Sequence, residues 1–191
     1  MNISVISSSI REGSSTRRVA IHLFEKLKQE GKCNPDLIDL TNYEYPIWKE
    51  VFHLETNPPD ECIELHDKLI GADAMIFVTP EYNGSYSLAL KNMVDYYGVK
   101  VFEKKAVGVS SVTVGSLGGI RAGIQLQQLV LAIYAHPAPQ MLLVPKVQEC
   151  FDENGNLLDP TFEKNISLFL REFLWLAEAL NGKNESGHLP K

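Results

Sequence analysis

The chain has 191 residues, 45% of them hydrophobic and 22% charged, and carries a formal net charge of -6. This composition is typical of one globular domain and excludes a largely disordered chain. The negative charge argues against broad nucleic-acid binding through a basic surface, although one arginine beside a helix N-terminus can still hold a phosphate.

Cysteine content and hydropathy indicate which cross-links, metal sites and cellular compartment to expect. Cys33, Cys62 and Cys150 are far apart in the sequence, with no CxxC or Cys/His cluster, so we expect neither a disulfide framework nor a metal site. Free thiols are typical of a reducing, cytoplasmic compartment. We expect no signal peptide and, since no apolar run approaches about 18 residues, no membrane segment.

The first predicted unit is a strand, a polar loop and a helix. Residues 3–6 form a short apolar run, and helical spacing resumes at Ala20, Leu23 and Leu27. The loop between them, residues 7–17, holds five serines, a threonine, a glycine and two arginines. Hydroxyls, free N–H groups and a helix N-terminus can bind a phosphate. A serine-rich helix cap with surface arginines explains the same residues about equally well.

Two other phosphate-binding motifs are absent from the sequence. It contains no GxxxxGK[ST], which excludes a P-loop, and no GxGxxG, which excludes a dinucleotide Rossmann fingerprint.

The next segments add a second strand, a long loop and a helix. Residues 35–40 read as a strand and residues 60–70 as a helix. Residues 41–59 between them carry four aromatic side chains and little periodicity. Such a loop could border a substrate pocket, lie in a subunit interface, or be a surface loop pinned by its aromatics.

The stretch after the third strand is the most informative. Residues 74–78 are an unbroken apolar run, typical of a strand buried on both faces. A loop follows, and a helix begins near Ser85 or Ser87, either of which can cap it. In the loop, Tyr82 offers a ring face, Asn83 can donate and accept, and Gly84 allows close backbone approach. These residues suit a flat heterocycle, but an ordinary hydrated turn favours them too.

The remaining elements complete an alternating pattern. Residues 106–109 form a fourth strand, followed by a glycine-rich loop at 112–119 and a helix that begins near Arg121, which by base rate is a surface charge. Residues 141–144 are a fifth strand, and the Asn-Gly pair within 151–157 predicts a hairpin. A long amphipathic helix follows. We predict one domain over residues 1–182 and a polar tail over 183–191.

The motif Pro-Glu-Tyr-Asn-Gly-Ser at 80–85, with Leu-Lys-Asn at 90–92 and Asp95, resembles the signature of the NADPH-dependent FMN reductase family, the flavodoxin-like quinone and azo reductases. The first loop resembles that family's phosphate loop, Gly-Ser-x-Arg-x-x-Ser. The chain departs from the pattern twice, with Ser8 in place of glycine and Ser87 in place of proline.

The resemblance implies where a cofactor would bind. It assigns the FMN phosphate to the first loop and the isoalloxazine ring to the two later loops, of which the third would approach the pyrimidine side. The residues implied to bind the cofactor are Ser9, Arg11, Ser14, Thr16, Pro80, Glu81, Tyr82, Asn83, Gly84, Ser85, Thr113, Gly115 and Gly118. It also implies a homodimer or homotetramer with the site near the subunit interface.

Strands that alternate with helices predict an α/β protein with a parallel sheet. Ligand-type loops after strands one, three and four must lie at one sheet edge. This fits a flavodoxin-like three-layer sandwich with five parallel strands in the order 2-1-3-4-5.

The resemblance then implies an FMN-dependent oxidoreductase that passes electrons from NAD(P)H to a quinone, an azo compound or free flavin. The partner is a small-molecule acceptor, with no nucleic acid and no membrane. The alternative is a non-enzymatic electron carrier or redox-sensing module. A flavodoxin proper normally has a Ser/Thr-x-Thr-Gly-x-Thr loop, which is absent here.

Overall fold

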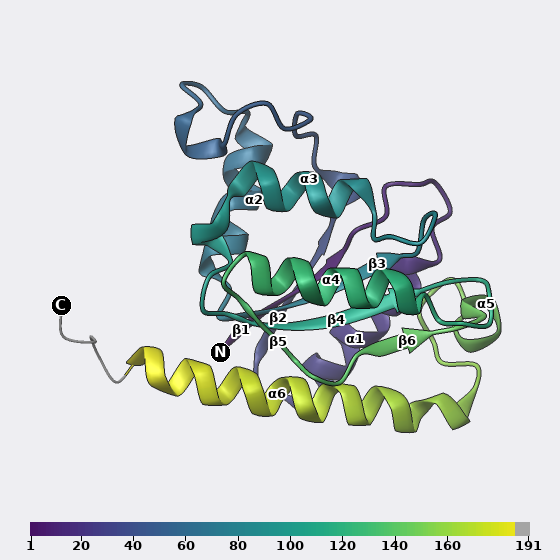
Figure 1. Cartoon of the computed structure of the whole chain (residues 1–191). Coiled ribbons are helices and arrows are strands. Elements are labelled where there is room, and N and C mark those ends of the chain that lie inside the picture. Colours follow the sequence, from purple (N-terminus) through teal and green to yellow (C-terminus); the bar gives the residue numbers. More distant parts are fainter. Residues whose placement is uncertain (186–191) are drawn as a thin grey trace.

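A parallel β-sheet forms the centre of the structure, a computed structural model that describes residues 1–185 (Figure 1). The strands in sheet order are β2 (Asn34–Asp39), β1 (Asn2–Ser7), β3 (Ala74–Pro80), β4 (Ala106–Val112) and β5 (His136–Pro137). A sixth strand, β6 (Leu142–Val144), also pairs with β4, and every pairing is parallel. The predicted order 2-1-3-4-5 is confirmed.

The fifth strand is divided into two short pieces along β4, whereas the sequence pattern predicted one strand at 141–144. The His136 N–H donates to the Lys105 carbonyl and the Ala138 N–H to the Val107 carbonyl, both at 2.9 Å. Proline occupies the alternate positions, 137 and 139. Positions 137 and 139 face away from β4, so the missing proline N–H groups remove no hydrogen bond to β4, and pairing with β4 starts again at Leu142.

Helices cover both faces of the sheet, so the fold has three layers (Figure 1). One face carries α1 (Thr16–Glu30) and α6 (Glu163–Glu185). The other carries α2 (Asp60–Gly71), α3 (Leu88–Tyr97) and α4 (Ile120–Ala132). A short helix, α5 (Val147–Cys150), follows β6 and has no counterpart among the predicted elements.

Alternate residues of the central strands supply the two cores. On β3, Ile76 and Val78 face the core beneath α1 and α6, and Met75 and Phe77 face the core beneath α2, α3 and α4. All four are fully buried. This explains the continuous apolar run in the sequence, since a strand covered on both faces needs apolar residues at every position.

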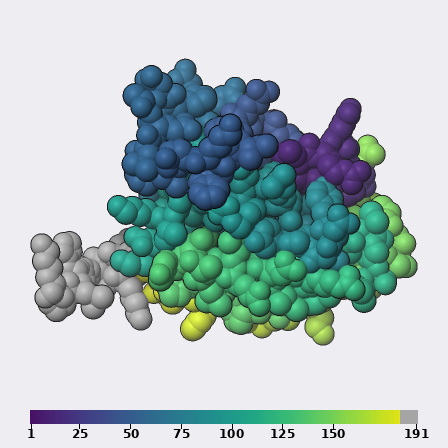
Figure 2. Space-filling model, turned by 45° about the horizontal axis from the view of Figure 1, so that its top comes forward, coloured from purple at the N-terminus to yellow at the C-terminus, as the bar shows by residue number. Residues whose placement is uncertain are grey.

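The long loop after β2 is pinned to α2 and α3 by its aromatic residues. The Tyr45 hydroxyl donates to the Ala89 carbonyl at 2.8 Å, and the Trp48 N–H donates to Asn92 Oδ1 at 2.7 Å. The Phe52 ring stacks on the His66 ring with centroids 4.6 Å apart. Of the predicted alternatives, these contacts support a surface loop held in place by its aromatic side chains. The loop lies in the blue region of Figure 2.

The C-terminal third differs from expectation in two places. The predicted hairpin is a single antiparallel bridge between Phe151 and Leu157 around Gly155, with no flanking strands. Helix α6 continues to Glu185, past the predicted domain end at residue 182, and residues 186–191 of the predicted tail lie outside the described residues. Within residues 1–185, none of the helices combines the length and apolarity needed to cross a bilayer.

Candidate functional site

Three loops meet at the carboxyl edge of the sheet. We call them the β1 loop (residues 8–15), the β3 loop (81–87) and the β4 loop (113–119). Because β3 lies between β1 and β4 in a parallel sheet, the β3 loop lies between the other two. They gather at the right of Figure 1. Ligands bind at this edge in open α/β sheets.

The β1 loop leads into α1 through a tight turn. Gly13 has a positive φ of 67°, which reverses the chain, and the Ser14 N–H donates to the Arg11 carbonyl at 3.2 Å. The Thr16 N–H donates to Ser14 Oγ at 3.2 Å. Ser15 precedes the helix without making a side-chain cap. Uncapped N–H groups in the first turn of a helix can bind an anion.

Two pockets adjoin the β1 loop, with volumes of ≈ 480 Å³ and ≈ 320 Å³. Both are lined by residues 11–14. The larger pocket extends toward the end of β2, and the smaller one toward the β3 and β4 loops, where Pro80, Tyr82 and Thr113 line it. A ligand in the smaller pocket would therefore contact all three loops.

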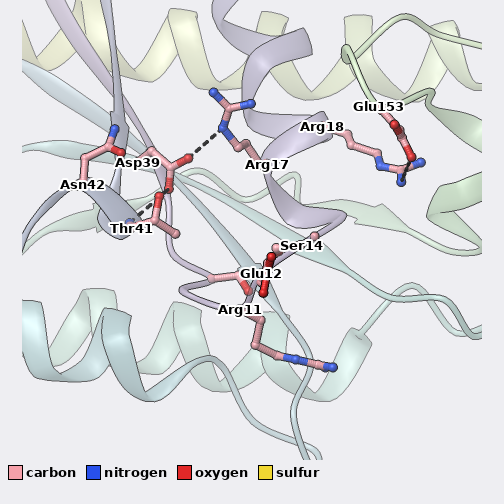
Figure 3. Close-up of a pocket in the computed structure, with 11 residues that line it drawn as sticks. Arg11, Glu12, Ser14, Arg17, Arg18, Asp39, Thr41, Asn42 and Glu153 are labelled. Carbon is pink, nitrogen blue, oxygen red and sulfur yellow. Dashed lines mark hydrogen bonds and ion pairs between the residues drawn. The ribbon is translucent and has the colours of Figure 1, made fainter.

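Most charges around the larger pocket are paired (Figure 3). Arg17 Nε lies 2.8 Å from Asp39 Oδ2, and Asp39 Oδ1 accepts from the Thr41 N–H and hydroxyl. Arg18 lies 3.8 Å from Glu153. Arg11 has no ion pair with any side chain among residues 1–182, and Figure 3 shows its side chain directed away from Arg17 and Arg18. It is the cation at this edge that remains available to an anionic ligand.

Tyr82 connects the β3 loop to the β1 loop. Its hydroxyl lies 2.9 Å from Ser9 Oγ, and the Arg11 guanidinium lies over its ring, 5.7 Å from the centroid. Arg11 thus occupies one ring face through a cation–π contact. Stacking of Tyr82 on a heterocycle stays a prediction, and it would have to use the ring face of Tyr82 that Arg11 does not cover.

Asn83 and Gly84 form a tight two-residue turn. The Tyr82 N–H donates to the Ser85 carbonyl at 2.9 Å, and the Ser85 N–H donates back at 3.0 Å. Both central residues have positive φ, 51° at Asn83 and 82° at Gly84. Asn-Gly is the preferred pair for such a turn, so the positive φ angles of the turn explain why these two residues occur here.

Helix α4 holds the β3 loop from the other side. Gln125 Nε2 donates to the Gly84 carbonyl at 2.8 Å, and the Ser85 hydroxyl donates to Gln125 Oε1 at 2.7 Å. The Glu81 carboxylate accepts from the Ala122 N–H at 3.4 Å and lies 3.5 Å from Arg121. Glu81 therefore interacts with the first turn of α4. Gln125 is not among the site residues predicted from the sequence, where its only signal is an amide one turn after Arg121.

The β4 loop is bound to the segment that follows β6. The Thr113 N–H donates to the Val144 carbonyl at 3.0 Å, and the Lys146 N–H donates to the Gly115 carbonyl at 2.9 Å. Gly118 has a φ of 62°, and a Cβ there would lie 2.9 Å from Leu143 Cβ. Only glycine fits at 118, so this residue is required by packing whatever binds nearby.

The predicted site residues lie in the three loops or at the strand and helix ends that border them. The residues that line one or both pockets are Ser9, Arg11, Ser14, Thr16, Pro80, Glu81, Tyr82 and Thr113. The others lie in the same loops outside the pocket lining: Asn83, Gly84, Ser85, Gly115 and Gly118.

The donor set fits a phosphorylated heterocycle. Hydroxyls, first-turn N–H groups and the available Arg11 suit a phosphate, and the adjoining pocket between the β3 and β4 loops suits a flat ring. Among the side chains of residues 1–182, no group of three or more His, Cys, Asp or Glu is arranged to hold a metal ion.

Comparison with known proteins agrees with this geometry. The family model described as NADPH-dependent FMN reductase matches residues 1–149. A quinone reductase of Pseudomonas putida is 31% identical over 169 residues, which cover 84% of this chain and 86% of that protein. An FMN-dependent NADPH-azoreductase of Staphylococcus aureus is 28% identical over 179 residues, covering 89% and 92%.

A solved structure shares the fold. The flavoenzyme NAD(P)H:(acceptor) oxidoreductase FerB of Paracoccus denitrificans superposes with a TM-score of 0.79 over 93% of this chain and 97% of that chain, at 23% identity.

Proposed function

Since the chain belongs to the NADPH-dependent FMN reductase family, we propose that it is an FMN-dependent oxidoreductase that passes electrons from NAD(P)H to a quinone, an azo compound or free flavin. The observation that carries the proposal is the meeting of three loops around one pocket, with Arg11 free of an ion pair within the described chain beside the N-terminus of α1. The chemistry that FMN supplies when bound is electron transfer between NAD(P)H and an oxidised acceptor.

The β1 loop is the proposed phosphate site. Ser9, Ser14 and Thr16 offer hydroxyls, and the first-turn N–H groups of α1 offer backbone donors. Arg11 adds a charge that the cation–π contact with Tyr82 already orients over the pocket. Held in this way before binding, the guanidinium loses less freedom when the phosphate arrives.

The β3 and β4 loops are the proposed ring site. Pro80, Glu81 and Tyr82 line one side of the smaller pocket, and Thr113 lines the other. Asn83, Gly84 and Ser85 fix the β3 loop by turn formation, and Gly118 fixes the β4 loop by close packing. The Gly115 N–H donates to Thr113 Oγ1 at 3.1 Å. We assign no proton-transferring residue. The chain's contribution is orientation of the cofactor and of whatever approaches its open face.

A spectroscopic titration tests the proposal. The purified protein, loaded with FMN if isolated without it, is mixed anaerobically with NADPH and then with NADH, and the visible flavin bands are recorded. Bleaching, followed by recovery when a quinone is added, is expected. Bound flavin that neither nucleotide bleaches would favour the alternative of an electron carrier or redox-sensing module. A protein that takes up no FMN would overturn the proposal.

We further propose a homodimer or homotetramer with the site near the contact between copies. Apolar side chains are exposed on α3 and α4, with Leu88 74%, Ile124 47% and Leu131 61% exposed. Ile124 and Leu131 are two turns apart and share a helix face. Exposed apolar surface of this kind marks protein contacts. The free thiols Cys33, Cys62 and Cys150 favour a reducing, cytoplasmic compartment.

A further inference from the structure

Two buried serines join the β1 loop to the β3 loop. Ser8 directly follows β1, Ser87 is the N-cap of α3, and their side chains are buried at 0% and 2% exposure. The Ser87 hydroxyl donates to the Ser8 carbonyl at 2.7 Å and lies 3.1 Å from the Ser8 hydroxyl. The contact bridges 79 positions of sequence.

Each serine is also fixed to the end of β3. The Ser8 N–H and hydroxyl donate to the Val78 carbonyl at 3.0 Å and 2.9 Å. The Ser87 N–H donates to the Thr79 hydroxyl at 3.0 Å, and Ser87 Oγ accepts from the Leu90 N–H at 3.2 Å. We call this set of contacts the serine frame. Hydrogen bonds away from water are strong and directional, so the frame fixes the separation of the two loops.

The frame depends on serine at both positions. These are the two places where the chain departs from the glycine and proline of the resemblance described above. Glycine at 8 would remove the hydroxyl that bonds Val78, and proline at 87 would remove both the N–H that bonds Thr79 and the hydroxyl that bonds Ser8. The two departures contact each other directly.

We propose that Ser8 and Ser87 are positioning residues that couple the two loops, so that binding of the FMN phosphate and of the ring reinforce each other. This inference rests on the proposed function. Ser9, next to Ser8, borders one pocket, and residues 80–82 border the other. Without the frame the loops keep the contact of Tyr82 with Ser9 but lose their buried connection, so a ligand that spans them must order both to a greater extent on binding.

The experiment compares FMN with riboflavin, which has the ring but no phosphate. Dissociation constants for both are measured by quenching of flavin fluorescence in the wild type, Ser87→Ala, Ser8→Ala, the double variant and Ser110→Ala. Ser110 is the matched control, because it is also fully buried and donates to a main-chain carbonyl, that of Leu142 at 3.2 Å. The readout is the ratio of riboflavin to FMN dissociation constants.

Ser87→Ala is expected to lower this ratio by about fivefold, the equivalent of one buried hydrogen bond. Ser8→Ala should lower it less, because the carbonyl that accepts from Ser87 remains. The double variant should match Ser87→Ala, since both substitutions break one frame. Ser110→Ala should leave the ratio unchanged.

An unchanged ratio in Ser87→Ala, additive losses in the double variant, or an equal loss in Ser110→Ala would overturn the coupling. If Ser87→Ala folds poorly, Ser87→Thr keeps a capping hydroxyl and must preserve the ratio. If neither the wild type nor Ser110→Ala binds flavin, the proposed function fails instead. The frame is then judged by urea unfolding, where non-additive destabilisation by the two alanines supports it and additive destabilisation overturns it.

Discussion

Arg11 is the residue on which phosphate binding should depend most. It has no ion pair with a side chain of residues 1–182, and Tyr82 holds it over the pocket that all three loops border. Arg11→Ala is expected to weaken FMN binding by about 1.5–3 kcal/mol, the range for hydrogen bonds to charged groups. Fluorescence titration of the apoprotein with FMN measures the dissociation constants of the variant and the wild type.

Arg171→Ala is the control for Arg11→Ala, because Arg171 lies on α6 and, among the described side chains, pairs only with its neighbour Glu172. FMN affinity in this control should equal that of the wild type. FMN retention that is equally strong in Arg11→Ala would remove Arg11 from the phosphate site.

His22 makes stability depend on pH. Its Nδ1 lies 2.9 Å from the Gly155 carbonyl, and its Nε2 is buried with no partner among the described residues. Burial lowers the pKa of His22, partly opposed by the hydrogen bond to Gly155. Below the ordinary histidine pKa the unfolded chain therefore binds a proton that the folded chain does not, and stability falls as pH falls through that window.

His22→Gln tests this linkage, because its amide can still donate to Gly155 without taking up a proton. Urea unfolding at pH 7 and pH 5 should show a smaller acid loss in the variant than in the wild type. Equal losses would mean that the His22 pKa is the same in the folded and unfolded chain.

At the level of elements, β4 and α6 fit together only because residue 108 is glycine. A Cβ there would lie 2.9 Å from Phe169 Cζ and 3.1 Å from Phe173 Cδ2. Gly108→Ala is expected to lower the free energy of unfolding by about 1–3 kcal/mol through overpacking. The control is Gly182→Ala on α6, where a Cβ would meet nothing within 4 Å. Its stability should be unchanged or higher by up to about 1 kcal/mol.

Helix α4 is expected to set the shape of the β3 loop through Gln125. Gln125→Ala removes the donor to Gly84 and the acceptor of Ser85, and should weaken FMN binding by about 3- to 10-fold. The control is Gln128→Ala, which changes an exposed amide on the same helix that makes no hydrogen bond with the side chains or backbone of residues 1–182. Equal affinities in the two variants would assign Gln125 no role in the loop.

Elements with strong local sequence patterns could be predicted from the sequence. Elements that depend on contacts with distant parts of the chain could not. The apolar run of β3 and the helical spacing of α1 and α4 gave correct assignments. Strand β4 extends past the predicted end because Ser110 and Ser111 are buried by pairing with β6, which polarity alone does not reveal. The Asn-Gly turn lies at 83–84, where Gln125 supports it, while the pair at 154–155 closes a longer loop.

The site could be predicted only as three loops. The strand order predicted that these three loops form one site, because loops after adjacent parallel strands lie at the same edge of the sheet. The contacts between them did not follow. Ser8 with Ser87, Ser9 with Tyr82, and Glu81 with Ala122 join residues far apart in the chain. No spacing rule connects them, so only the folded chain reveals them.

For the whole molecule, the exposed face of α3 and α4 predicts self-association. Leu131→Glu places a charge where copies would meet and is expected to shift the protein to a monomer in size-exclusion chromatography with light scattering. Trp175→Gln is the control, since Trp175 is 68% exposed on α6, which covers the opposite face of the sheet. A wild type that is monomeric at micromolar concentration would contradict the proposed assembly.

The fifth strand also limits association between copies of the chain through the edge of the sheet. Along β5 the N–H groups of His136 and Ala138 point inward to β4, so the outward positions are 137 and 139, and both are proline. This border of the sheet therefore offers no N–H donor at those positions to a strand from another molecule, which is a common protection against edge-to-edge aggregation. Pro137 and Pro139 therefore disfavour fibre-like growth at this edge of the sheet, and the exposed helical faces remain the route to ordered assembly.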